Sequence, residues 1–105
     1  EYKKLAEMDP TYSMTVIPGG TYKGVPSDVK TVASPVLTYT TEDLPEEVAY
    51  KITKAFWENK KIMADAHAIG KGIDIKGIKY GIAKVHPGAL RYYKEVGVEI
   101  PASMR

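Results

Sequence analysis

Two histidines carry the broadest chemistry in this chain, because imidazole can bind a metal ion or transfer protons near neutral pH. His67 and His86 are far apart in the sequence, and neither belongs to a His-x-x-x-His or Glu-x-x-His pattern. The carboxylate nearest to His67 in the sequence is Asp65, which would lie on a different face of a helix. The spacing therefore predicts structural roles: His67 finishes a helix, and His86 packs or caps the turn before Pro87.

Residues for covalent catalysis are also missing from the sequence. It contains no cysteine, which excludes disulfides, thiolate nucleophiles and cysteine-bound metals. No serine lies in a Gly-x-Ser-x-Gly elbow or has a recognisable base partner. We therefore predict that the chain is not an enzyme and that it has no catalytic residue, no metal ion and no cofactor. A small enzyme using His67 or His86 is the disfavoured alternative.

A glycine-rich segment, Ile17 to Gly24, is the remaining candidate for ligand chemistry. Its sequence lacks the Gly-x4-Gly-Lys-Ser/Thr order of a phosphate-binding loop. The simpler interpretation is a turn that leaves a strand. The alternative is that backbone N–H groups and the hydroxyl of Thr21 or Tyr22 face a ligand cleft. Thr21 and Tyr22 are therefore the candidate ligand-binding residues.

Composition and charge are those of one small globular domain. The chain has 105 residues, of which 44% are hydrophobic and 27% are charged. Its 15 basic and 13 acidic residues leave a net charge of +2, which argues against nucleic acid as a partner. The longest uncharged run, which includes Thr11 to Tyr22, is much shorter than the roughly 20 apolar residues of a membrane-spanning helix.

The first part of the chain predicts a helix followed by two strands. An amphipathic helix ends at Met8, because Asp9-Pro10 disfavours its continuation. Tyr12 to Ile17 alternates apolar and small polar residues, which is typical of a strand. After an exposed connection, Thr31 to Thr40 predicts a second strand, in which Pro35 favours an edge position or a bulge.

The strongest helix signal follows this strand. Asp43 and Glu46 have the capping-box spacing, and Pro45 would fall in the first turn. We predict a helix from Pro45 to about Asn59, which continues or kinks into a segment ending near His67. Its apolar residues recur at three-, four- and seven-residue steps and predict a buried stripe. The stripe consists of Val48, Ile52, Ala55, Phe56, Met63 and Ala66.

The last third of the chain predicts short elements and one more helix. Residues 68–85 contain several glycines and predict a short strand or a helical turn with a loop. A final helix is predicted from Ala89 to Val96 with Tyr93 facing inward, and Gly97 is predicted to end it. We interpret Val98 to Arg105 as a tail.

Several of these segments together resemble a known family. The order of motifs resembles the C-terminal part of the TAXI-type solute-binding proteins of TRAP transporters, over most of residues 8–97. Gly20 and Lys23 depart from the pattern of that family. The segments that carry the resemblance are Ile17 to Gly24, Thr31 to Tyr39, Asp43 to Glu58, His67, and His86 to Gly97.

The resemblance implies an α/β fold: a partial lobe and the C-terminal helices of a type II periplasmic binding protein-like fold. Such two-lobed proteins need roughly 300 residues. Residues 1–105 would therefore be a single C-terminal fragment, which alone does not bind solute. The chain opens at Glu1 with no initiator methionine or signal-type apolar segment, which also predicts a mature protein or an excised fragment.

The resemblance also implies a function in transport. The parent protein would be a periplasmic or extracytoplasmic receptor that captures a small anionic solute, amino-acid or dicarboxylate-like, and delivers it to a TRAP membrane permease. Strand edges exposed in a fragment would favour self-association with a second copy. The alternative function is a small standalone protein-interaction module that uses Trp57, Tyr50 and neighbouring apolar surface.

Overall fold

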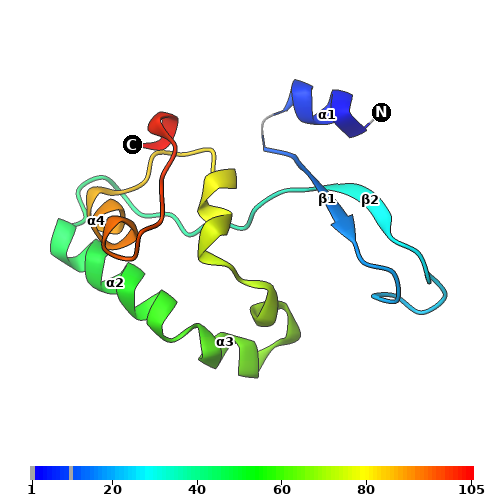
Figure 1. The fold of residues 1–105 in the computed structure, drawn as a ribbon. Helices are drawn as coiled ribbons and strands as arrows, with labels where there is room; N and C mark the ends of the chain where they lie inside the picture. Colours follow the sequence, from blue (N-terminus) through cyan, green and yellow to red (C-terminus); the bar gives the residue numbers. More distant parts are fainter. Residues whose placement is uncertain (1, 10) are drawn as a thin grey trace. The chain divides into compact units, whose positions relative to one another are not determined.

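The computed structural model describes residues 2–9 and 11–105, and the chain divides into two compact units (Figure 1). The first, here called the hairpin unit, spans Glu1–Leu37, and the second, the helical unit, spans Thr38–Arg105. The hairpin unit contains α1 (Tyr2–Met8), β1 (Ser13–Ile17) and β2 (Val29–Ala33). The helical unit contains α2 (Glu46–Glu58), α3 (Lys60–Ala66), η1 (Ala68–Gly72), η2 (Ile75–Tyr80), α4 (Pro87–Glu95) and η3 (Ala102–Met104).

The hairpin unit confirms the first predicted strand and shortens the second. β1 and β2 pair antiparallel, in a register that runs from Ser13 opposite Ala33 to Ile17 opposite Val29. The predicted strand from Thr31 to Thr40 is wrong after Ala33, since residues 34–40 form no strand. Pro35 explains this end, because it has no N–H to continue the ladder. The helix predicted to end at Met8, before Asp9-Pro10, does end there, and Pro10 itself lies outside the described residues.

The predicted capping box at the start of α2 is wrong. Pro45 occupies the N-cap with φ −55° and ψ 135°, and no side chain caps the helix. A helix capped by Asp43 would need a helical Leu44, and the residue before a proline is disfavoured in that region. Asp43 instead accepts a hydrogen bond from the side chain of Thr41, which lowers the pKa of its carboxyl group.

The long helix was predicted to continue or to kink near Asn59, and the structure shows the kink and the predicted end near His67. Asn59 separates α2 from α3 with φ −109° and ψ 18°. Its N–H still donates to the Ala55 carbonyl at 3.2 Å, so the helical ladder continues into the break. His67 is the C-cap of α3, and its N–H donates to the Met63 carbonyl at 3.0 Å.

The buried face of α2 is not the predicted apolar stripe. α2 packs on α4, and its buried residue is Ala49, with Trp57 half-buried on the same face. Val48 and Ile52 of the predicted stripe are exposed, at 41% and 54%. The reason is the close approach of the two helices. A side chain at Gly88 would meet the Ala49 Cβ at 2.9 Å, so only small residues fit between them.

The core of the helical unit includes the segment predicted to be a tail. Tyr93, Ile100 and Met104 are buried together, and half-buried side chains of α2, η2 and α4 pack against them. The Val85 N–H donates to the Met104 carbonyl at 2.7 Å, which ties this segment to the chain before α4. Interpreting Val98 to Arg105 as a tail was therefore wrong, because two of the three core residues come from it.

Of the strand and the helical turn predicted for residues 68–85, the structure shows helical turns, and it confirms the predicted helix stop. Residues 68–85 contain the 3-10 helices η1 and η2. α4 ends in a Schellman motif around Gly97, whose φ is +74°. The Gly97 N–H donates to the Lys94 carbonyl at 3.2 Å, and the Val98 N–H donates to the Tyr93 carbonyl at 2.8 Å. A positive φ suits glycine, because it has no Cβ.

Candidate functional site

The loop between β1 and β2 is built from two consecutive turns. The Thr21 N–H donates to the Pro18 carbonyl at 3.2 Å, and Gly20 has φ +81°. The Val25 N–H donates to the Tyr22 carbonyl at 3.1 Å, and Gly24 has φ +85°. A positive φ at the third residue of each turn is the signature of type II turns. The glycines therefore fix a folded loop.

Of the two predicted ligand-binding residues, the structure brings one to a surface hollow. Tyr22 is 61% exposed and lines an open hollow of about 490 Å³ on the loop. Thr21 does not line it, and its hydroxyl donates to the Pro18 carbonyl at 2.6 Å. The Thr21 hydroxyl thus serves the turn, whereas Tyr22 remains a ligand candidate.

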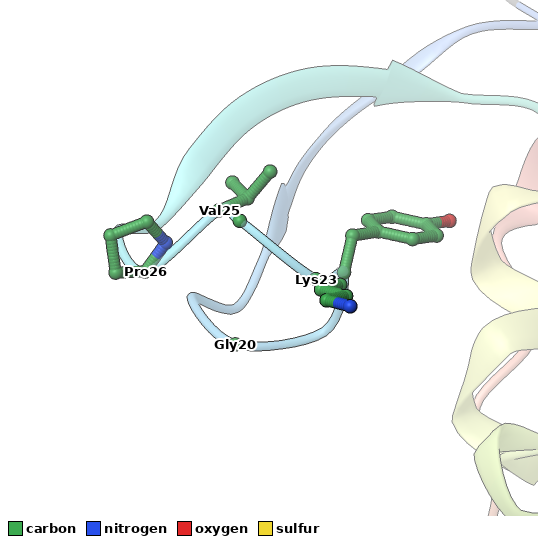
Figure 2. A pocket seen from close by; sticks show the side chains of 6 residues that line it. Gly20, Lys23, Val25 and Pro26 are labelled. Atoms are coloured by element: carbon green, nitrogen blue, oxygen red, sulfur yellow. The ribbon is translucent and has the colours of Figure 1, made fainter.

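Lys23 also lines the hollow, although it was not among the ligand-binding residues predicted from the sequence. Figure 2 shows Gly20 and Lys23 on one limb of the loop, and Val25 and Pro26 on the limb that returns to β2; all four line the hollow. In the sequence, Lys23 stood out only as a departure from the family pattern. Its charge beside a tyrosine in a glycine-rich turn was the available signal.

The polar groups of this loop include several hydrogen-bond donors, although the lining of the hollow is mostly apolar. Within the described residues, the N–H groups of Lys23 and Gly24 donate no hydrogen bond. The Lys23 ammonium and the Tyr22 hydroxyl add further donors to the same loop. The nearby Asp28 carboxylate already accepts a hydrogen bond from the Gly19 N–H at 2.8 Å. A carboxylate is the kind of group that such a set of donors can hold.

His86 has a structural role, as predicted. Its Nδ1 accepts a hydrogen bond from the Gly88 N–H at 3.1 Å, so it caps the start of α4. Its Nε2 lies 2.9 Å from the Leu44 carbonyl oxygen. Because Nδ1 accepts, Nε2 carries the proton and donates to Leu44. Nδ1 therefore caps α4, and Nε2 joins it to the segment that enters α2.

His67 caps η1 in a similar way, since its Nδ1 accepts a hydrogen bond from the Ile69 N–H at 3.2 Å. The structure does not bring His67 and His86 together through any hydrogen bond between residues 11 and 105. Across the described chain, no three His, Cys, Asp or Glu residues gather as a metal ion would require.

Arg91, which lies in the same motif as His86, also serves the contact between α2 and α4. Its guanidinium stacks 3.7 Å from the centre of the Tyr50 ring and donates to the Glu47 carboxylate at 2.8 Å. The Tyr50 hydroxyl donates to Glu95 at 2.6 Å. The bond from Arg91 lowers the pKa of Glu47, and the bond from Tyr50 lowers the pKa of Glu95, where Lys54 contributes further.

These two pKa shifts predict that the helical unit loses stability in acid. The folded pKa values of Glu47 and Glu95 lie below the ordinary value of 4.5, so the folded state favours the charged carboxylates. This stability is complete above pH 4.5 and is lost as the pH falls through the folded pKa values. Thermal unfolding followed by Trp57 fluorescence, from about pH 7 to about pH 3, should show the loss.

Glu95→Gln should remove part of this acid sensitivity, because the amide cannot titrate. Glu99→Gln is the matched control, since Glu99 is exposed and forms no ion pair with the described residues. If both variants keep the full acid sensitivity of the unsubstituted chain, the Tyr50–Glu95 bond does not contribute to it.

A comparison with protein families covers nearly the whole chain. A family model described as the NMT1-like family matches residues 1–97. The chain belongs to the NMT1-like family. This family is periplasmic binding protein-like and is associated with extracytoplasmic solute-binding components.

Membership of the NMT1-like family supports the coarser part of the fold prediction. The family suggests a periplasmic binding protein-like fold, and the helices with one two-stranded sheet are compatible with part of such a domain. Proteins of this family are typically extracytoplasmic. None of the described helices combines the length and the apolar character that crossing a membrane requires. Family membership connects the chain to solute binding in general.

Proposed function

We propose that this chain is the C-terminal part of a TAXI-type solute-binding receptor that serves a TRAP transporter. The order of motifs from Ile17 to Gly97 supports this subdivision within the periplasmic binding protein-like families. Residues 1–105 then supply part of one lobe. The receptor captures a small anionic solute, amino-acid or dicarboxylate-like, and passes it to the membrane permease.

The observation that carries this proposal is the open hollow on the β1–β2 loop, where a lysine and a tyrosine lie beside two glycines. Lys23 and Tyr22 line it, and the N–H groups of Lys23 and Gly24 are free of partners among the described residues. A solute with a carboxylate would match these donors in charge and hydrogen bonding.

Energetics indicate that this loop is only one wall of the binding site. An exposed ion pair contributes about 1 kcal/mol or less in water. A dissociation constant of 1 µM requires about 8 kcal/mol. The open loop with its single lysine supplies a small share of that, so the opposite wall must come from another part of the receptor.

The isolated chain should therefore bind glutarate, a simple dicarboxylate, only weakly. We expect a dissociation constant above about 1 mM, with amide chemical-shift changes concentrated at Tyr22, Lys23 and Gly24. Lys23→Gln should weaken binding about fivefold, which corresponds to the loss of about 1 kcal/mol. The measurement is an NMR titration of the labelled chain.

Lys30→Gln is the matched control, because Lys30 is an exposed lysine of β2 that does not line the hollow. It should leave both the affinity and the shifts unchanged. Shifts that map elsewhere, or that Lys23→Gln leaves intact, would contradict the site. Binding much tighter than 1 mM in calorimetry would instead contradict the claim that the loop is one wall of the cleft.

We also propose two macromolecular partners. The TRAP permease is the partner of the whole receptor. A second copy of the chain is a partner of this piece, since the described sheet has two strands and the outer edge of each is unpaired within it. The alternative function is a protein-interaction module that uses Trp57, Tyr50 and neighbouring apolar surface. Trp57 and Tyr50 contact α4, so the exposed apolar face of α2 is what favours this alternative.

A further inference from the structure

The helices α2 and α3 leave one continuous face without a partner in the described structure. α2 packs on α4 through Ala49, and α3 packs on η1, where Gly70 lies against the Met63 backbone. The opposite face of both helices is exposed, and Figure 1 shows α3 running on from α2 in nearly the same direction. The residues in the centre of this face, here called the seam, are Val48, Ile52, Ala55, Asn59, Ile62 and Ala66.

The spacing of the seam is that of a coiled coil. Its residues follow one another at alternating steps of four and three, which is the heptad pattern of a helix that pairs with another helix. All six are exposed, and Ile62 is 66% exposed. From Val48 to Ala66 the seam is at most about 27 Å long at 1.5 Å per residue, since the break at Asn59 can only shorten it. An exposed apolar face of this kind marks an interaction site.

We propose that this seam binds the seam of a second copy of the chain in an antiparallel pair. In that arrangement Ile52 faces the partner's Ile62, Val48 faces the partner's Ala66, and Ala55 faces the partner's Asn59. The two isoleucines of the seam face each other, and Val48 faces a small alanine. Both halves of the interface are identical, as a two-fold dimer requires. The Asn59 amide already donates to the Ala55 carbonyl at 2.8 Å, so it has a hydrogen-bond partner when the seam is covered.

Charges beside the seam favour the antiparallel direction. Lys51 and Asp65 flank the seam on the same side, and antiparallel pairing places each opposite the other in the partner. Glu58 lies near the two-fold axis, where its ion pair with Lys54 at 3.8 Å reduces repulsion between the two copies. Parallel pairing would instead set Lys51 against the partner's Phe56. Antiparallel helix dipoles also attract, whereas parallel ones repel.

Sedimentation equilibrium of the full 105-residue chain tests the association. We expect a monomer–dimer equilibrium with a dissociation constant below about 1 mM. Ile52→Asp should weaken it about a hundredfold, because each dimer buries this side chain twice. Ile69→Asp is the matched control, since Ile69 is 78% exposed and lies on η1 outside the seam. The control should dimerise like the unsubstituted chain.

Circular dichroism should show that both variants remain folded, because both isoleucines are exposed. A chain that stays monomeric throughout the concentration range would overturn the proposal. A dimer that survives Ile52→Asp would also overturn it, and would place the contact elsewhere, for example at the strand edges of the hairpin unit.

Single cysteines test the direction of the pair, since the chain has no cysteine of its own. In an antiparallel dimer, the two copies of Ala55→Cys lie near the axis and should be joined by a short maleimide cross-linker. The two copies of Val48→Cys would be about 27 Å apart along the helices and should not be joined. Efficient cross-linking of Val48→Cys would indicate parallel pairing and would overturn the proposed arrangement.

Discussion

Gly88→Ala should destabilise the helical unit by about 3 kcal/mol, the upper end for overpacking a tight contact. A Cβ at this position would collide with the Glu46 carbonyl oxygen and would lie 2.7 Å from the Tyr50 nitrogen. Both are backbone atoms of α2, so they cannot move aside as the end of a side chain can. The helices α2 and α4 must separate, which weakens the contacts of Arg91 with Tyr50 and Glu47.

Urea unfolding followed by Trp57 fluorescence measures this loss, because the only tryptophan of the chain lies on α2 and its indole N–H donates to the Tyr93 hydroxyl at 3.3 Å. Gly77→Ala is the control, since nothing lies within 4 Å of a Cβ built there. It should change the free energy of unfolding by less than about 1 kcal/mol. Equal effects of the two substitutions would show that the close approach of α2 and α4 does not limit the size of residue 88.

Ile100→Ala should have a comparable effect, about 2 to 5 kcal/mol, although it lies in a segment that the sequence presents as a tail. Ile100 is 5% exposed and belongs to the core with Tyr93 and Met104. Removing most of its side chain leaves a cavity in a small core. Since small domains are stable by only about 5 to 15 kcal/mol, much of the helical unit's stability depends on this residue.

The matched control is Ile69→Ala, which removes the same atoms from a side chain that is 78% exposed. It should leave the free energy of unfolding within about 0.5 kcal/mol of the unsubstituted chain. The same Trp57 fluorescence measurement serves both variants. If Ile100→Ala is no more destabilising than its control, the C-terminal segment does not contribute to the core.

Local features of the fold could be predicted because neighbouring residues determine them. The stop at Gly97 follows from the need for a positive φ at the end of α4, which glycine meets without strain. His86 caps α4 because the ring reaches the N–H two residues later. The break near Asn59 and the turns of the Ile17 to Gly24 loop are local in the same sense.

The candidate site was only partly predictable. Glycine spacing drew attention to the loop, and Tyr22 lines the hollow there. The sequence does not show that the Thr21 hydroxyl is already used by Pro18, or that the N–H groups of Lys23 and Gly24 are free within the described chain. These facts depend on how the two turns fold back, so only the structure places Lys23 at the hollow.

Short patterns in the sequence determined the helix stop at Gly97, the break near Asn59 and the turns of the Ile17 to Gly24 loop. They also indicated a periplasmic binding protein-like fold, which the match to the NMT1-like family supports. Tertiary structure alone decided which helix face is buried and which segments form the core. An amphipathic period shows that one face of α2 is apolar, but α4 approaches closely only where Gly88 meets Ala49. That approach leaves Val48 and Ile52 exposed, because burial depends on the shape and position of the partner as well as on hydrophobicity.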